Sequence, residues 1–363
     1  MERVKKIQHW LKENDISWAF ITSTPNVFYF SHFYSDPHER LLAIAIFQEE
    51  EPILICPQME VAQAKQAGWA YEIIGYDDTE NPWDLLQKRI AKREIVTERI
   101  AIEKEHMTIA RLEQLQARFS NASFIDITEK VRSIRMIKDE NELRILRQAA
   151  ELADLGVEIG VRSLAEGKTE LEIVAAIEYE LKKKGVRSMS FATMVLTGEN
   201  SAAPHGVPGT KTIERGHFVL FDLGVVLDGY CSDITRTVAF GSATAQQKEI
   251  YETVLKAQLA AIHACQVGQK IGQIDKAART IIEQAGYGAY FPHRVGHGLG
   301  IDVHEYPSMN ETNEMTLEKG MVFTIEPGIY VPSIGGVRIE DDIYMTENGP
   351  MILTNYPKEL QII

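Results

Sequence analysis

Residues 218–240 read FVLFDLGVVLDGYCSDITRTVAF, a strongly apolar segment that contains two separated aspartates. Its β-branched and aromatic residues favour strands, and Asp228 and Gly229 near its centre favour a turn. We therefore predict a hairpin in which one strand carries Asp222 and the other carries Asp233. An unpaired ionised carboxylate in such a strand costs on the order of several kcal/mol, so the two aspartates are expected to share a cation.

Three further candidate ligands lie in comparable surroundings downstream. Glu326 ends the apolar run MVFTIE, Glu340 lies in GGVRIEDDIYM, and His297 lies in HRVGHGLG. His293 and His297 have the spacing of a helix face, but the glycines around them favour strand and loop. Strand alternation would place Arg338, Glu340 and Asp342 on one face, where the guanidinium could orient the metal-binding carboxylate.

The type and number of these ligands predict the kind of metal site. Four carboxylates with one imidazole suit Mn(II), Fe(II), Co(II) or Zn(II), whereas a structural zinc site would normally cluster Cys and His. Four carboxylates are many for one ion, so the pattern favours two ions about 3.5–4 Å apart, a centre that activates hydroxide for hydrolysis. Salt-bridged strand ends are the alternative, but few Lys or Arg residues lie in these strands.

Composition excludes several classes of protein. The chain has 363 residues, of which 45% are hydrophobic and 25% charged, as expected for two or three globular domains. A net charge of -14 argues against nucleic acid or an anionic membrane as partner. No apolar run approaches the roughly 18 residues that span a bilayer. The charged N-terminus and three scattered cysteines lead us to expect a cytoplasmic protein with reduced thiols.

The chain changes character near residues 126–138, which predicts domains at 1–130 and 131–363. Short apolar strands alternate with helices in the first part, which indicates an α/β domain. Capping signatures at Asp139 and Thr169 open two helices of the second part. Two more helices are expected at 244–267 and 274–285, separated by GQKIG, and strands with glycine loops follow Tyr287.

Four motifs in order carry a resemblance to a known family: FDLGVVLDGYCSDITRT, HRVGHGLGIDVHEYP, TIEPGIY and GGVRIEDD. They resemble the dinuclear metallopeptidases of the methionine aminopeptidase, aminopeptidase P and prolidase group, and prolidase (Xaa-Pro dipeptidase) most closely. The resemblance covers about residues 139–363, and FYFSHFYSDPHERLL at 28–42 resembles the creatinase/prolidase N-terminal domain. It implies an α+β pita-bread catalytic domain, a curved antiparallel sheet covered by helices, and often a homodimer.

The resemblance also implies roles for individual residues. It makes Asp222 a terminal ligand of one divalent ion, Asp233 and Glu340 bridging ligands, and His297 with Glu326 the remaining ligands of the second ion. Manganese is the expected metal, with cobalt or zinc as alternatives. Glu326 would assist proton transfer. His205, His293 and His304 match the family's active-site histidines, which bind substrate and stabilise the tetrahedral intermediate, and Arg338 matches the family's arginine two positions before the last ligand and is expected to take part in catalysis. Without the resemblance, His205 would be an ordinary turn histidine and Arg338 a structural partner of Glu340.

The expected activity is hydrolysis of Xaa-Pro dipeptides. An aminopeptidase P that releases the residue before proline from longer peptides shares the chemistry, and a binding module on the same fold would have lost it. The presence of the complete ligand set disfavours the module and also the metal-independent creatinases. Some prolidases use an arginine between the second active-site histidine and the Glu-Pro-Gly motif to read substrate, but residues 305–324 contain a single cation, Lys319.

Overall fold

The computed structural model describes residues 2–363 and divides the chain after Arg135 into two compact units. The first unit contains a six-stranded sheet in the order β4-β3-β2-β1-β5-β6. Its strand β1 pairs antiparallel with β2 and parallel with β5, as is common in mixed α/β sheets. The elements are α1 (Glu2–Glu13), β1 (Trp18–Ile21), α2 (Thr24–Ser31), β2 (Ala43–Phe47), β3 (Ile53–Pro57), the 3-10 helix η1 (Gln58–Glu60), α3 (Val61–Gln66), β4 (Glu72–Tyr76), α4 (Pro82–Lys92), β5 (Arg99–Ile102), α5 (Ile109–Arg118), β6 (Ser123–Asp126) and α6 (Thr128–Met136).

The second unit consists of antiparallel sheets and two pairs of helices. The largest sheets have the orders β14-β13-β15-β18-β19 and β12-β9-β8. The elements are α7 (Glu140–Ser163), α8 (Glu170–Lys183), β7 (Ser188–Met189), β8 (Met194–Thr197), η2 (Gly198–Ala202), β9 (Phe218–Leu223), β10 (Val225–Leu227), β11 (Tyr230–Cys231), β12 (Ile234–Ala239), α9 (Ala245–Ala264), α10 (Ile271–Gln284), η3 (Gly288–Tyr290), β13 (Gly296–Gly298), β14 (Glu305–Met309), β15 (Val322–Ile325), β16 (Gly328–Val331), β17 (Gly335–Arg338), β18 (Asp341–Thr346) and β19 (Gly349–Ile352).

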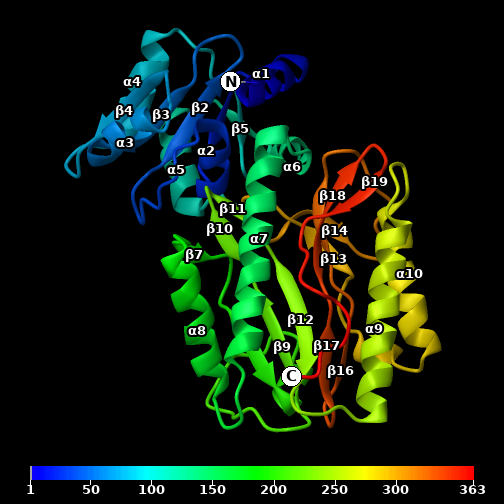
Figure 1. The fold of residues 1–363 in the computed structure, drawn as a ribbon. Coiled ribbons are helices and arrows are strands. Elements are labelled where there is room, and N and C mark those ends of the chain that lie inside the picture. The colour runs from blue at the N-terminus through cyan, green and yellow to red at the C-terminus, as the bar shows by residue number, and fades with distance from the viewer. Residues whose placement is uncertain (1) are drawn as a thin grey trace. The chain divides into compact units, whose positions relative to one another are not determined.

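Each pair of helices covers one half of the second unit (Figure 1). Helices α7 and α8 bury apolar residues such as Ile177 against Phe221 and Val238 of β9 and β12. Helices α9 and α10 bury a second cluster against the five-stranded sheet, which includes Val254 and Phe323. The expected fold class, an α/β unit followed by an α+β unit of antiparallel sheet covered by helices, is confirmed.

Local sequence signals explain how the helices start. Asp139 caps α7 and Thr169 caps α8, each through a capping box with a glutamate three residues on, as predicted. Among residues 2–363, no helix combines the length and the apolar character that crossing a bilayer requires. The three cysteines are buried free thiols.

Two local predictions were wrong. Helix α10 begins at Ile271, inside GQKIG, because the N–H groups of Ile271 and Gly272 donate to the carbonyls of Met315 and Asn313 (2.8 and 2.9 Å), so the helix needs no side-chain cap. The segment VRIEDD is also not one strand. Strand β17 ends at Arg338 and β18 begins at Asp341, because β17 pairs with β16 whereas β18 pairs with β15.

Candidate metal centre

The five predicted ligands come from strand ends in both halves of the second unit. Asp222 lies in β9, and Asp233 immediately precedes β12. These strands pair in the predicted hairpin, with Asp222 opposite Thr235, and residues of the turn, Asp228 and Gly229, have positive φ (47° and 84°). On the other side, His297 is the central residue of β13, and the two glutamates flank strands: Glu326 follows β15 and Glu340 precedes β18.

Backbone hydrogen bonds link the two halves near the site, among them one from the Cys231 N–H to the Gly300 carbonyl at 2.7 Å. The Glu340 N–H donates to the Thr235 carbonyl at 3.1 Å, which holds the end of β17 beside β12. Ligand atoms of Asp233, His297 and Glu340 consequently lie within 4.8 Å of one another. His297 Nε2 is also 3.3 Å from Glu326 Oε1 and 3.7 Å from Asp233 Oδ2. All five side chains line one cavity of about 370 Å³.

Unpaired oxygens in this cavity fit a cation. Asp222 Oδ1, Asp233 Oδ1 and Glu340 Oε1 are buried and have no hydrogen-bond partner. Buried polar atoms are hydrogen-bonded in the great majority of cases, so three such oxygens around one cavity require an explanation. Divalent cations take carboxylate oxygens as ligands, and one or two ions here would satisfy all three atoms.

The electrostatics of the carboxylates support the same conclusion. Burial, followed by repulsion from neighbouring carboxylates, raises the pKa of Asp233 and of Glu340 well above the ordinary value. Burial is also the largest cause that raises the pKa of Glu326, to about 7. Among residues 2–363, Arg338 is the only Lys or Arg side chain that forms an ion pair with these carboxylates, through Asp222. Divalent ions would supply the missing positive charge and favour the ionised form of each carboxylate.

His297 is prepared to act as a ligand. Burial, and then the nearby His304, lower the pKa of His297 to about 3, so the ring is neutral at physiological pH. Its Nδ1 lies 3.2 Å from the Gly298 carbonyl, which fixes the proton on that nitrogen. Nε2 is then the nitrogen with a free lone pair, and it points at the carboxylates.

Hydroxyl groups orient the two glutamates predicted to be ligands. Thr235 Oγ1 donates to Glu340 Oε2 at 2.6 Å, and Thr324 Oγ1 donates to Glu326 Oε1 at 3.3 Å. Such contacts hold ligating atoms in place and strengthen metal binding. Asp342 also acts behind the site, because its Oδ2 accepts the Asp233 N–H at 3.1 Å.

The predicted catalytic residues line the same cavity: His205, His293, His304, Glu326 and Arg338. The side chains of His205 and His304 lie in its exposed part, and the His304 ring centroid is 4.0 Å from that of His297. His293 lies deeper. Its Nδ1 is 2.8 Å from the Arg294 carbonyl, so its Nε2 accepts the proton of the Tyr330 hydroxyl, also at 2.8 Å.

Arg338 reaches a different carboxylate from the one expected. Its guanidinium pairs with Asp222 rather than with Glu340, and its Nε donates to Thr235 Oγ1 at 3.0 Å. Through that hydroxyl it reaches Glu340 indirectly. Its Nη1 donates to the Tyr330 hydroxyl at 2.8 Å and to the Pro204 carbonyl at 3.5 Å. Strand alternation alone did not predict the pairing of Arg338 with Asp222.

The comparisons with known proteins agree with this geometry. Residues 144–347 match metallopeptidase family M24, and residues 3–137 match the creatinase/prolidase N-terminal domain. The chain belongs to metallopeptidase family M24. It is therefore a peptidase of a family that works with divalent metal ions, and the family resemblance seen in its sequence motifs is confirmed.

Individual relatives cover the whole chain. A curated protein of Bacillus subtilis (strain 168), named "Putative dipeptidase YkvY", is 57% identical over 100% of both chains. The solved prolidase of Pyrococcus horikoshii OT3 has a TM-score of 0.92 and 38% identity, covering 99% of this chain and 100% of its own. The X-Pro aminopeptidase of Thermotoga maritima MSB8 has a TM-score of 0.88 and 34% identity, covering 96% and 98%.

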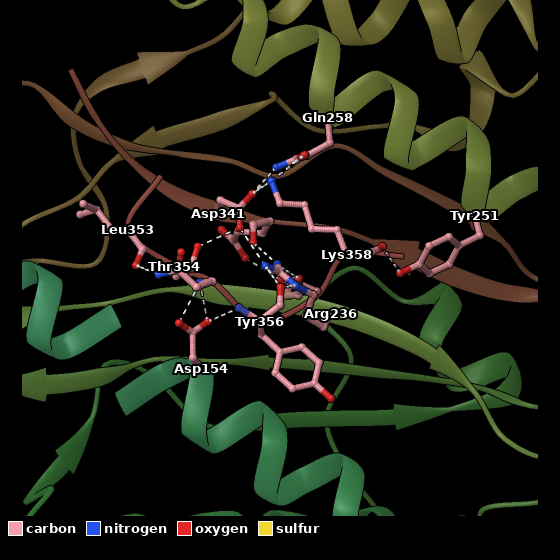
Figure 2. Close-up of polar contacts among 12 residues, drawn as sticks. Asp154, Arg236, Tyr251, Gln258, Asp341, Leu353, Thr354, Tyr356 and Lys358 are labelled. Atoms are coloured by element: carbon pink, nitrogen blue, oxygen red, sulfur yellow. Dashed lines mark hydrogen bonds and ion pairs between the residues drawn. The ribbon is translucent and has the colours of Figure 1, made fainter. Parts of the chain in front are cut away.

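A buried arginine lies directly behind this M24 site. The Arg236 side chain, 1% exposed, donates through Nη1 to the backbone carbonyls of Glu340 and of Thr235 (3.0 Å to the latter). On its other side it donates to the Tyr356 carbonyl through Nε (2.9 Å) and Nη2 (2.7 Å), and pairs with Asp341 (Figure 2). Arg236 thus connects a predicted metal ligand to the C-terminal segment.

Asp341 is the centre of this network. Its Oδ1 accepts from Arg236 and from Thr354 Oγ1, both at 2.8 Å, and its Oδ2 accepts from Gln258 Nε2 at 2.6 Å and from Lys358 (Figure 2). Burial alone would raise the pKa of Asp341, but the charges of Arg236 and Lys358 outweigh it and lower this pKa. The side chain is an ionised carboxylate with complete hydrogen bonding, in contrast to the ligands beside it.

Sequence reasoning missed Tyr330, Arg236 and Asp341. Tyr330 is 5% exposed, and burial raises the pKa of its hydroxyl to about 12. The signals available were a tyrosine in the apolar strand after Glu-Pro-Gly and adjacent acids in GGVRIEDDIYM. Neither signal identifies the distant partners, such as His293 for Tyr330 and Arg236 for Asp341.

Proposed function

We propose that this M24 peptidase hydrolyses the Xaa-Pro bond of dipeptides. The observation that carries the proposal is the convergence of Asp233, His297 and Glu340, with unpaired carboxylate oxygens, in a cavity of about 370 Å³. Similar proteins that are named as a dipeptidase and a prolidase support the choice of substrate. A cavity of this size suits a small ligand.

We propose two divalent ions as cofactors, with manganese the first candidate and cobalt or zinc the alternatives. Asp233 and Glu340 would bridge them, Asp222 would complete one ion, and His297 with Glu326 would complete the other. When bound, such ions supply Lewis-acid polarisation of a carbonyl and a lowered pKa for a coordinated water. The unpaired oxygens and the neutral imidazole support this assignment.

The chain's own residues would handle protons and substrate. Glu326, which lines the cavity beside His297, is the group that we propose accepts and returns a proton. A leaving proline nitrogen has no N–H and must gain a proton, which makes such a group necessary. In our proposal, His304 and His205 at the exposed side donate hydrogen bonds to the carbonyl oxygen as it gains charge. His293, Tyr330 and Arg338 form one hydrogen-bonded chain that fixes the wall behind them.

A second candidate is an aminopeptidase that acts on longer peptides with proline in the second position. The similarity to the X-Pro aminopeptidase of Thermotoga maritima, with a TM-score of 0.88, favours it. Both candidates share the metal chemistry, so they differ only in the length of peptide that the cavity accepts.

The deciding experiment uses metal-stripped protein with Mn(II), Co(II) or Zn(II) added back. Substrates are Ala-Pro, Ala-Pro-Ala and the proline-free control Ala-Ala. Metal-dependent cleavage of Ala-Pro with little cleavage of the others is the expected result. Preference for Ala-Pro-Ala would favour the aminopeptidase, and no turnover of any substrate with two ions bound would refute the peptidase assignment.

We also propose that the protein works as a homodimer in the cytoplasm. The buried free thiols support a reducing compartment. Light scattering at several protein concentrations would test the dimer, and a particle with the mass of a single chain at all concentrations would refute it.

A further inference from the structure

The Arg294 guanidinium lines the same cavity as the predicted ligands. Arg294 lies between His293 and β13, and it is partly buried. Its Nη1 donates to Ser308 Oγ at 3.0 Å, and Ser308, in β14, pairs with His297 of β13. Asn310 Nδ2 donates to the same hydroxyl at 2.9 Å. A strand-borne hydroxyl thus holds one edge of the guanidinium in a defined position beside the site.

The charge of Arg294 is not neutralised by the protein. Among residues 2–363, no carboxylate lies within ion-pair distance of its guanidinium, whereas the other arginine of the cavity, Arg338, pairs with Asp222. The positive charge of Arg294 affects other groups that line the cavity. Burial lowers the pKa of His304, and Arg294 is the next cause. A guanidinium has five N–H donors in a planar fork, and a single bond to Ser308 leaves most of them for a ligand.

Two lysines of the second unit that could compete for an anion are already paired. Lys319, the single cation of residues 305–324, forms an ion pair with Glu347 and is 55% exposed. Lys138 forms a buried ion pair with Glu305 at 3.2 Å. Arg294 is therefore the cation of this cavity that is available, by geometry and by charge, to receive an anion from outside.

We propose that Arg294 binds the C-terminal carboxylate of the dipeptide and selects dipeptides over longer substrates. This inference rests on the proposed function and adds the residue that reads substrate length. In Xaa-Pro the carboxylate belongs to the residue that follows the scissile bond. Extension by one residue replaces this carboxylate with a neutral amide and moves the charge by roughly 3.3–3.6 Å. A guanidinium held by Ser308 cannot follow that shift without losing its support.

The test compares Ala-Pro with Ala-Pro-amide, in which the carboxylate is neutralised and the scissile bond is unchanged. Hydrogen bonds to charged groups contribute enough to predict a roughly 10- to 100-fold higher KM for Ala-Pro in Arg294→Gln, with kcat nearly retained. KM for Ala-Pro-amide should be the same in both proteins. Arg294→Lys should recover part of the loss, because it restores the charge without the planar fork. The matched control is Arg162→Gln, which removes an arginine with a 77% exposed side chain.

The outcomes separate this inference from the proposed function. If Arg294→Gln changes both substrates equally, or leaves the preference for Ala-Pro over its amide intact, Arg294 does not read the carboxylate and the inference is wrong. If wild-type protein cleaves neither, the proposed function fails by itself. Calorimetric binding of Ala-Pro and Ala-Pro-amide to metal-free protein then decides the inference, because equal affinities of the wild type for the two would overturn it.

Discussion

Replacing Asp341 with Asn tests how much the charge network behind the site stabilises the protein. The two side chains have nearly the same shape, so the change removes the charge without opening a cavity. In the wild type each oxygen of Asp341 accepts two hydrogen bonds, from Arg236 and Thr354 on one side and from Gln258 and Lys358 on the other. Whichever way the amide turns, its NH₂ group faces two donors that have lost their acceptor.

The magnitude follows from those two lost contacts. Leaving a buried donor unsatisfied costs about 1–3 kcal/mol, and more when it is charged. Breaking a buried ion pair by removal of one partner costs about 3–5 kcal/mol, which agrees with two such donors. For a domain of the size of the second unit, each kcal/mol lowers Tm by about 2–4 °C, so Tm should fall by roughly 6–20 °C.

The assay is thermal unfolding of metal-free protein followed by circular dichroism. The control is Glu347→Gln, which breaks a surface ion pair between Lys319 (55% exposed) and Glu347 (70% exposed). Such exposed pairs contribute at most about 1 kcal/mol to the free energy of unfolding. Because the wild-type pKa of Asp341 is lowered, its contribution is present above the unfolded pKa and is lost as pH falls through the folded value. A Tm loss no larger than that of the control near neutral pH would refute the reasoning.

The same variant tests the link to the metal site. Arg236 binds the carbonyls of Glu340 and Thr235, so Asp341→Asn should also weaken Mn(II) binding, by roughly 10- to 100-fold as for other supporting contacts. Isothermal titration calorimetry measures this directly. Unchanged affinity in a destabilised protein would show that the network supports the fold alone.

Three further predictions concern pH, metal and the loop that carries His205. Burial lowers the pKa of His293 to about 4, so between that pH and the ordinary pKa the unfolded chain binds more protons than the folded protein. From pH 7 to pH 4, the unfolding free energy of the wild type should therefore fall by roughly 3 kcal/mol more than that of His293→Gln. A difference between the two proteins that does not change with pH would contradict this. Mn(II) at a hundredfold excess over Kd should add about 2.7 kcal/mol of stability, measured as a chelator-reversible rise in Tm, and Glu340→Gln should lose most of that rise. Glu170 is fully buried and accepts backbone N–H groups on both sides of the His205 loop, both at 2.8 Å. Because one hydrogen bond to a charged group contributes about 1.5–3 kcal/mol, Glu170→Gln should lower kcat/KM by roughly 10- to 100-fold. The variant Glu172→Gln, at an exposed helix cap, should leave kcat/KM unchanged.

Local sequence patterns were sufficient to predict many features of the protein. Apolar runs and capping residues predicted the strands and the starts of α7 and α8, and the turn at Asp228 and Gly229 predicted the hairpin of β9 and β12. These signals act over a few residues, where periodicity and turn chemistry reflect the backbone directly. The order of the motifs also predicted the family.

Only the tertiary structure decided which distant side chains meet. Arg338 pairs with Asp222, and Arg236 pairs with Asp341, because β12 lies beside the break between β17 and β18. Arg294 binds Ser308 and has no carboxylate partner among residues 2–363. A strand's alternation predicts which side chains share a face, but it carries no information on the strand that packs against that face. Long-range pairing depends on the packing of the whole unit. For that reason the sequence predicted the candidate metal ligands, whereas the structure identified the groups that position them.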